Sequence, residues 1–264
     1  MGFAQKIAGL QDLLHFDNWP MLVLGRTFDR RTGLVTYRKG RYEILVDHHG
    51  GDENGTRACV VSDMYRRHLN SIGIRGPVRV LDLGANGGGF PLMLLLNGYD
   101  IAQAVCVEMN PLTSLRLRIN LATNLGSRAT AINAAVCGAD APPEISLEPS
   151  RGSTGLSMYK NQAAATETHL TVPTTNISAL CDQYFPEAPI DICKIDIEAA
   201  EYEAIESTPD SVLSRIRSIM IEFHDASRTP SCLRRLQSAG FIDVTGDRDS
   251  HASATTEVRA FRRV

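Results

Sequence analysis

The sequence lacks several features that define whole classes of protein. Its six cysteines are scattered and never form a Cys-x-x-Cys pair, which argues against a disulfide framework and favours reduced, buried thiols. No window approaches the roughly 18 apolar residues of a transmembrane helix, and no basic segment followed by an apolar run marks a signal peptide. A formal net charge of −3 gives no general attraction for nucleic acid. We therefore expect a cytoplasmic protein with neither a membrane nor a nucleic-acid partner.

What is present is an ordinary globular composition of 264 residues, 43% of them hydrophobic and 22% charged. A chain of this length can bury a large core. From Pro77 onward, strand-like apolar segments alternate with helical ones, which is typical of a mostly parallel sheet covered on both faces. The sequence thus predicts an α/β domain over residues 77–264. An extension over residues 1–76 is expected to cap this domain or to form a homodimer contact.

The extension is predicted to contain helices and a small sheet, separated by a polar, glycine-rich loop. The loop carries His48, His49, Asp52 and Glu53, whose side chains offer metal-ligand chemistry. Sequence neighbours on a loop rarely face one site, so a solvated or substrate-contacting loop is the favoured interpretation. The predicted elements are a helix over residues 1–14, strands over 21–24, 34–37 and 42–46, and a helix over 57–72.

The α/β domain is predicted to contain five parallel strands and an antiparallel pair at the end of the chain. The parallel strands are expected over residues 78–83, 104–108, 129–136, 191–198 and 218–225, and the pair over 241–244 and 257–261. Helices are expected over 115–121, 177–184 and 230–239. An insertion over residues 138–173 contains short predicted strands at 144–147, 156–159 and 169–172, and such an insertion often shapes a substrate pocket.

The first strand of the domain runs directly into a glycine cluster and an apolar helix. Glycine lets a backbone approach a ligand closely, and open α/β sheets bind ligands beyond the carboxyl ends of their strands. A dinucleotide fingerprint fits poorly, because Asn86 stands where the second glycine belongs. Asp82 precedes this turn and Glu108 ends the next strand, where a carboxylate suits a ribose with both hydroxyls free. The two carboxylates favour a cationic, phosphate-free cofactor such as S-adenosylmethionine.

A second polar group follows two later strands: Asp196 and Glu198, then Glu222 and His224. Residues two apart on a strand share a face, so we expect all four to converge beside the cofactor. A carboxylate or His224 can then serve as general base for a substrate hydroxyl. Alternatively, Asp196, Glu198 and Glu222 can hold Mg²⁺, which prefers oxygen ligands. A plainer interpretation is that these residues cap the next helix and bond loop amides.

Four segments occur in order along the domain. They are Val80-Leu81-Asp82-Leu83-Gly84-Ala85-Asn86-Gly87, then Val107-Glu108-Met109-Asn110-Pro111 with Asn120 and Asn124, then Lys194-Ile195-Asp196-Ile197-Glu198-Ala199-Ala200-Glu201, and finally Ile221-Glu222-Phe223-His224. Together they resemble the FkbM family of S-adenosylmethionine-dependent O-methyltransferases. The resemblance runs over residues 78–241 and does not cover the extension. The family usually has Gly where this chain has Ala199.

The resemblance implies the class I methyltransferase sandwich and methyl transfer to a hydroxyl, often on a natural product or a sugar. It places Asp82, Gly84 and Asn86 at the methionine end of the cofactor, Glu108 on the ribose, and Asn133 with Ala134 near the adenine. Ala85, Gly87, Met109 and Asp196 complete the predicted cofactor contacts. The predicted substrate is a polar, hydroxylated small molecule. Two alternatives are an NAD(P)-dependent oxidoreductase and a catalytically inactive scaffold with the same fold.

Overall fold

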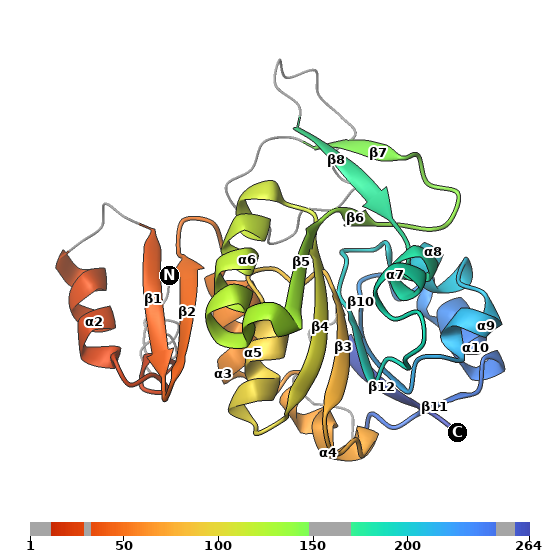
Figure 1. The fold of residues 1–264 in the computed structure, drawn as a ribbon, viewed down its shortest axis with the longest axis horizontal. Coiled ribbons are helices and arrows are strands. Elements are labelled where there is room, and N and C mark those ends of the chain that lie inside the picture. The colour runs from red at the N-terminus through yellow and green to blue at the C-terminus, as the bar shows by residue number, and fades with distance from the viewer. Residues whose placement is uncertain (1–11, 29–32, 148–169, 247–256) are drawn as a thin grey trace.

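The structure is a computed structural model that describes residues 12–28, 33–147, 170–246 and 257–264. The predicted strand over residues 156–159 and most of the predicted helix over 1–14 lie outside the described residues. Within those ranges, no helix is long and apolar enough to cross a bilayer. The chain forms one mostly parallel sheet between two layers of helices, with a smaller N-terminal part packed against one layer (Figure 1).

The main sheet has seven strands in the order β11-β12-β10-β9-β3-β4-β5. Strands β3, β4, β5, β9 and β10 are parallel, and β12 is antiparallel to both β10 and β11. This arrangement confirms the predicted α/β fold and its terminal antiparallel pair. The bounds are β3 Val78–Leu83, β4 Ile101–Glu108, β5 Ala129–Asn133, β9 Ile192–Ile195, β10 Ser218–Phe223, β11 Phe241–Asp243 and β12 Glu257–Arg263.

Two helical layers bury the two faces of the sheet in separate cores (Figure 1). Successive strand side chains point to opposite faces, so Val80 of β3 packs on the side of α5 and Leu81 on the side of α7. Asp82 therefore lies on the same face as Val80. One layer contains α5 Gly89–Leu96 and α6 Pro111–Leu125 with the 3-10 turn Gly126–Arg128, and the other contains α7 Ile177–Tyr184, α8 Glu201–Glu206, α9 Asp210–Leu213 and α10 Thr229–Ser238.

The order of the strands reverses at β3. Strands β4 and β5 follow on one side of it, whereas β9 and β10 lie on the other side. The carboxyl ends of β3 and β9 therefore border a topological switch point, and doubly wound sheets bind their ligands at such a crevice. The glycine turn that follows β3 lies at this position.

The strand predicted over residues 129–136 is interrupted. β5 ends at Asn133, and after Ala134 the chain leaves the main sheet to form β6, Ala135–Val136. β6 joins β8, Leu170–Thr175, and β7, Glu144–Leu147, in a three-stranded sheet. The sequence could not show this change of partner, because the same β-favouring residues fit either sheet.

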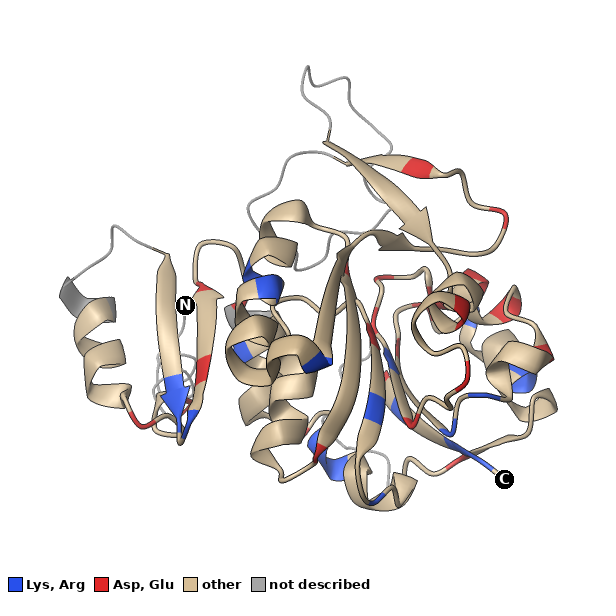
Figure 2. Ribbon diagram, viewed as in Figure 1, with Lys and Arg blue, Asp and Glu red and all other residues tan. Residues whose placement is uncertain are grey.

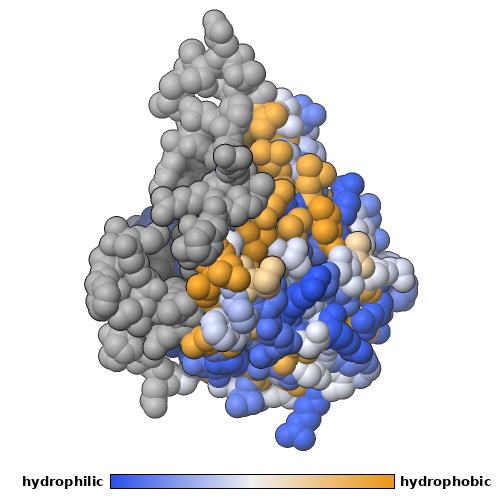
Figure 3. Space-filling view, turned by 90° about the vertical axis from the view of Figure 1, so that its left-hand side faces the viewer, coloured by the Kyte–Doolittle hydropathy of each residue, from blue (hydrophilic) through white to orange (hydrophobic). Residues whose placement is uncertain are grey.

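The prediction of a strand over residues 21–24 is wrong, because these residues lie inside helix α2, Trp19–Phe28. Pro20 stands in the first turn, where its missing N–H breaks no helical hydrogen bond. Leu22 is buried whereas Met21 is 68% exposed; the short apolar run alone could not distinguish a helix from a strand. Apolar residues gather on this N-terminal side of the molecule, which faces the viewer in Figure 3.

The predicted hairpin is confirmed as β1, Leu34–Lys39, and β2, Tyr42–Asp47. Strand β2 docks on α6 through two asparagine side chains. Oδ1 of Asn120 accepts from the amide of Leu45 at 2.7 Å, and its Nδ2 donates to the Leu45 carbonyl at 2.9 Å. Asn124 bonds the backbone of Glu43 in the same way, at 3.1 and 2.7 Å. Each carboxamide thus takes the place of a strand residue and fixes the extension to the domain.

The single helix predicted over residues 57–72 is broken into short pieces. A π-helical turn, Glu53–Arg57, leads into α3, Ala58–Val61, and a 3-10 turn, Arg66–His68, leads into α4, Leu69–Ile72. Between them, Ser62 has an extended backbone and ends α3. Ser and Asp at positions 62 and 63 compete with helix formation through local hydrogen bonds, which the apolar spacing alone did not reveal. The break brings Tyr65 into the lining of the cavity described below.

Candidate active site

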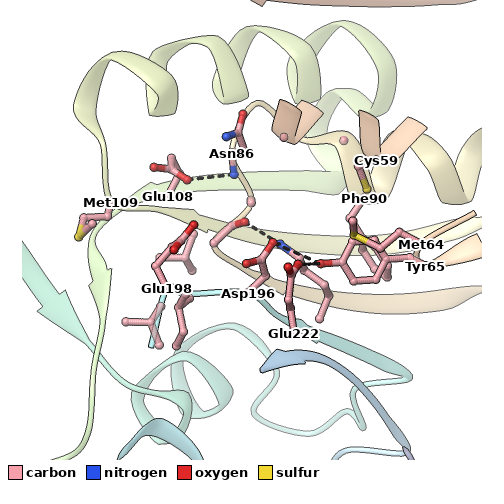
Figure 4. Close-up of a pocket in the computed structure, with 18 of the residues that line it drawn as sticks. Cys59, Met64, Tyr65, Asn86, Phe90, Glu108, Met109, Asp196, Glu198 and Glu222 are labelled. Atoms are coloured by element: carbon pink, nitrogen blue, oxygen red, sulfur yellow. Dashed lines mark hydrogen bonds and ion pairs between the residues drawn. The ribbon is translucent and has the colours of Figure 1, made fainter. Parts of the chain in front are cut away.

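A cavity opens at the switch point, beyond the carboxyl ends of β3, β4, β9 and β10 (Figure 4). Its empty space, counting the part that is open to solvent, is about 1150 Å³. Acidic positions gather at these strand ends (Figure 2). Of the residues predicted from the sequence, the lining contains Gly84, Ala85, Asn86, Glu108, Met109, Ala134, Asp196, Glu198, Glu222 and His224.

Glu108 forms one wall of the cavity and braces the glycine turn. Its Oε2 accepts from the amide of Asn86 at 2.9 Å, and its Oε1 accepts from the amide of Asn110 at 2.7 Å. Burial raises the pKa of the Glu108 carboxyl to about 7, against the lowering effect of these two amides. Each carboxylate oxygen has a further lone pair, so Glu108 remains able to accept a hydroxyl of a bound ribose.

Three of the predicted cofactor contacts lie behind the wall of the cavity rather than in it. Asn133 donates from Nδ2 to the carbonyls of Glu108, at 2.9 Å, and Met109, at 2.8 Å, so it holds the end of β4 in shape. Gly87 is buried in the turn, and a Cβ there would overlap the hydroxyl of Thr56. Asp82 is fully buried. These three residues are absent from the cavity lining, and their predicted contact with the cofactor stays a prediction, because strand position alone does not determine the depth of a side chain.

Asp82 is paired with Lys194, its register neighbour on β9. The ammonium lies 3.3 Å from Oδ1 of Asp82 and 3.4 Å from Oδ2 of Asp196, and it donates to the carbonyl of Gly84 at 2.6 Å. Burial disfavours the charge on Lys194, but Asp82 and Asp196 outweigh burial and raise its pKa. Burial raises the pKa of Asp82, and Lys194 opposes that effect. The pair therefore anchors the glycine turn from below.

The structure brings Asp196, Glu198, Glu222 and His224 together, as predicted, but not by strand alternation. β9 ends at Ile195 and β10 at Phe223, so only Glu222 is a strand residue. Nε2 of His224 lies 3.7 Å from Oδ1 of Asp196, 3.9 Å from Oε2 of Glu198 and 3.9 Å from Oε1 of Glu222. Helix α8 begins with Ala200 as its N-cap and has no side-chain cap bond, which removes the capping interpretation.

His224 is held by Glu201, a residue of α8 that is completely buried. Oε1 of Glu201 accepts from the backbone amide of His224 at 3.0 Å and lies 3.1 Å from its Nδ1. Burial acts to lower the pKa of His224, but Glu201, Asp196 and Glu198 together raise it to about 9. The imidazole therefore carries a proton at neutral pH. The prediction of His224 as the general base is not favoured by this arrangement.

Glu222 is better suited to accept a proton. Burial and the neighbouring Asp196 raise the pKa of Glu222 to about 7, against the opposing charges of His224 and Lys194. The hydroxyl of Tyr65 lies 3.2 Å from Oδ2 of Asp196 and 3.4 Å from Oε2 of Glu222, and the three side chains point toward one another (Figure 4). A general base acts best with a pKa near the working pH.

Three of these side chains also offer a geometry for a cation. Ligand atoms of Asp196, Glu222 and His224 all lie within 4.8 Å of one another. The group differs from the predicted magnesium set, because His224 takes the place of Glu198. Two positive groups already face these carboxylates, the ammonium of Lys194 and the protonated imidazole of His224.

The loop after β9 has a left-handed backbone at two residues that are not glycine. Glu198 has a φ of 52° and Ala199 a φ of 80°. A Cβ is disfavoured in this region, at a cost of about 1–2 kcal/mol per residue. These two residues turn the chain so that Glu198 faces the cavity while α8 starts directly afterwards.

Replacing Ala199 with Gly is expected to raise the free energy of unfolding by about 1 kcal/mol, because glycine adopts a φ of 80° without strain. Urea denaturation measures the change. The control, Ala122→Gly in the exposed face of α6, is expected to lower stability by about 1 kcal/mol. A glycine at position 199 that is no better than alanine would show that the loop is unstrained.

Several lining residues were not predicted from the sequence. Cys59, Met64 and Tyr65 come from the extension, which precedes the recognisable motifs, and Lys194 lies inside a motif but received no role. Glu201 stands behind His224 in the same motif. The only available signal was the polarity of Lys194 within an otherwise apolar strand, since a buried charge requires a partner.

The chain matches the sequence profile of one protein family, described as the methyltransferase FkbM domain, over residues 82–242. No curated protein matches it. The matched segment begins at Asp82 and ends in β11, so it contains the glycine turn, the strand ends and α8 but leaves out the extension.

Solved structures of methyltransferases are similar in outline. A precorrin-6y methyltransferase from Geobacter metallireducens is 11% identical, with 75% of this chain and 86% of that chain covered at a TM-score of 0.44. A tRNA methyltransferase from M. jannaschii is 10% identical, with 89% and 58% covered at a TM-score of 0.47. A ribosomal protein methylase from Lactobacillus delbrueckii is 11% identical, with 76% and 80% covered at a TM-score of 0.41.

Proposed function

The chain belongs to the methyltransferase FkbM domain family, and from this premise we propose that it is an S-adenosylmethionine-dependent O-methyltransferase acting on a hydroxyl of a polar small molecule. Methyl transfer follows from the family. The choice of oxygen and of a small polar acceptor is supported by one observation, the meeting of Glu222, Asp196 and Tyr65 in the same cavity as Glu108.

The lining fits the chemistry of the cofactor. Glu108 offers acceptor oxygens for the ribose hydroxyls, and the apolar Val107, Ala134 and Val136 offer a flat wall for a base. The carboxylates of Asp196 and Glu198 offer counter-charges for an ammonium and a sulfonium. When bound, S-adenosylmethionine would supply an activated methyl group, so that the protein has only to align an acceptor and remove its proton.

Glu222 is the proposed general base. In its ionised form Glu222 would take up the proton that the acceptor hydroxyl loses during methyl transfer. The hydroxyl of Tyr65, 3.4 Å from Oε2 of Glu222, holds this carboxylate in place. His224 is kept protonated by Glu201. Its positive charge stabilises the negative charge that develops on the acceptor oxygen as the hydroxyl loses its proton.

A metal-assisted route remains the alternative, with Asp196 and Glu222 as oxygen ligands. Dialysis against a chelator distinguishes the two routes. Activity that survives complete removal of divalent cations supports Glu222 as the base, and activity that is lost and then restored by Mg²⁺ supports the metal.

Glu108→Gln is expected to weaken S-adenosylmethionine binding about 10- to 100-fold. Glutamine has one acceptor oxygen where glutamate has two, so it cannot accept from the amides of both Asn86 and Asn110 and also from the ribose hydroxyls. Calorimetric titration measures the dissociation constant. The control, Glu144→Gln on the exposed part of β7, is expected to bind as the wild type does. Wild-type protein that binds no S-adenosylmethionine, or that binds NADH instead, would contradict the proposed function.

A further inference from the structure

We propose that Thr56, a residue of the extension outside the matched family segment, is a positioning residue for the cofactor. This inference rests on the proposed function. Thr56 is fully buried and lies directly behind the glycine turn. Its hydroxyl donates to Oδ1 of Asn86 at 2.8 Å and accepts from the amide of Gly87 at 2.9 Å.

These two bonds fix the only non-glycine residue of the turn, residues 84–89, that has a left-handed backbone. Asn86 has a φ of 49°, a conformation that asparagine adopts more readily than most non-glycine residues. The backbone amide of Asn86 donates to Oε2 of Glu108 at 2.9 Å. The position of the Asn86 backbone therefore helps to orient the Glu108 carboxylate. Thr56 therefore acts on the ribose-binding wall through Asn86 and touches no ligand itself.

The contact leaves no room for adjustment. A Cβ at Gly87 would overlap the Thr56 hydroxyl, and a Cβ at Gly55 would overlap the side chain of Asn86. Both ends of the segment 55–65 line the cavity. Gly55 lies beside Asn86, and Tyr65 lies beside Glu222. The segment thus spans from the cofactor turn to the proposed base.

Strong interactions with α6 hold Thr56 in this position. The guanidinium of Arg116 forms a bidentate pair with Asp52, at 2.6 Å from Oδ2 and 2.9 Å from Oδ1, and both side chains are buried. Asn120 donates from Nδ2 to the carbonyls of Leu45, at 2.9 Å, and Gly87, at 2.7 Å. One side chain of α6 therefore contacts both the hairpin and the glycine turn. We therefore infer that cofactor binding requires the extension, which forms part of the wall of the site.

The test compares Thr56→Val, which removes both hydrogen bonds and keeps the shape, with Thr56→Ser, which keeps the hydroxyl. Thr56→Val is expected to weaken binding of S-adenosylmethionine and of S-adenosylhomocysteine about 10-fold by calorimetry. Thr56→Ser is expected to bind within about threefold of the wild type. The matched control is Thr208→Val, a buried threonine whose hydroxyl bonds the carbonyl of Ala204, and its binding is expected to be unchanged.

Hydrogen exchange of the backbone amides of residues 84–89, without any ligand, supplies a readout that does not depend on the proposed function. Thr56→Val is expected to speed exchange there at least 10-fold, and Thr56→Ser and Thr208→Val to leave it unchanged. A folded Thr56→Val protein with wild-type exchange and wild-type affinity would overturn the inference, as would a serine variant no better than the valine one. If Thr56→Val does not melt cooperatively, Thr56→Ala replaces it under the same criteria. Wild-type protein that binds neither nucleoside overturns the proposed function, while the exchange data still decide the role of Thr56.

Discussion

Glu222→Gln is expected to lower kcat by about 100- to 10,000-fold, the usual contribution of a positioned general base, while the dissociation constant of S-adenosylmethionine stays close to the wild-type value. Glutamine keeps the size of the side chain and its contact with Tyr65 but cannot take up a proton. Single-turnover measurements of methyl transfer give the rate. The control is Glu187→Gln, an exposed position, which is expected to turn over normally.

The proposed roles of Glu222 and His224 also predict how the rate changes with pH. Glu222 must be ionised to act as a base, and its pKa is raised to about 7, so kcat at saturating S-adenosylmethionine, where Glu108 is already engaged, is expected to rise as the pH increases through 7. His224, whose pKa is raised to about 9, loses its proton above that value, so the rate is expected to fall there. Glu222→Gln removes the lower limb and keeps the upper one. A variant that retains both limbs would exclude Glu222 as the base.

Lys194→Met is expected to lower the free energy of unfolding by about 3–5 kcal/mol, the usual cost of removing one partner from a buried ion pair. Methionine fills the space of the lysine stem but leaves Asp82 without its counter-charge in the interior. Urea denaturation at neutral pH measures the loss. Lys39→Met, which breaks an exposed pair with Asp17 at 3.6 Å, is the control and is expected to cost less than about 1 kcal/mol.

The double variant Lys194→Met with Asp82→Asn separates charge from packing. Because the buried charge of Asp82 is removed together with its partner, the double variant is expected to recover much of the stability that the single variant loses. A double variant that is no more stable than the single one would show that Lys194 contributes through its bond to the Gly84 carbonyl rather than through its pairing with Asp82.

The sheet was predictable because its strands are buried on both faces and appear as continuous apolar runs. Val78–Leu83 is the clearest example, and the structure has a cavity beside the glycine turn that follows it. Strand ends were less predictable: the run through Glu198 continues in sequence, but the backbone turns left-handed at Glu198 and Ala199. Local propensity does not encode such a turn.

The four members of the polar cluster were predicted to converge, and the structure brings them together, whereas their chemical roles stay predictions. The sequence placed His224 and Glu222 at neighbouring strand ends, and the structure brings them together. Which of the two accepts a proton depends on the contact with Glu201 and on burial. Both are set by the tertiary structure, and the spacing of residues along the sequence does not reveal them. Tyr65 was missed because it follows a break in a segment that was predicted as one helix. Thr56 lies just before that segment, in a π-helical turn to which no role was assigned.

The asparagine contacts between α6 and the hairpin have a consequence for biosynthesis. Leu45 is separated from its partner Asn120 by 75 residues, and Glu43 from Asn124 by 81. A nascent chain on the ribosome therefore exposes the hairpin without its partners until α6 has emerged, and long-range contacts of this kind form slowly. We therefore expect the docking of the hairpin on α6 to be a late event in the folding of this protein.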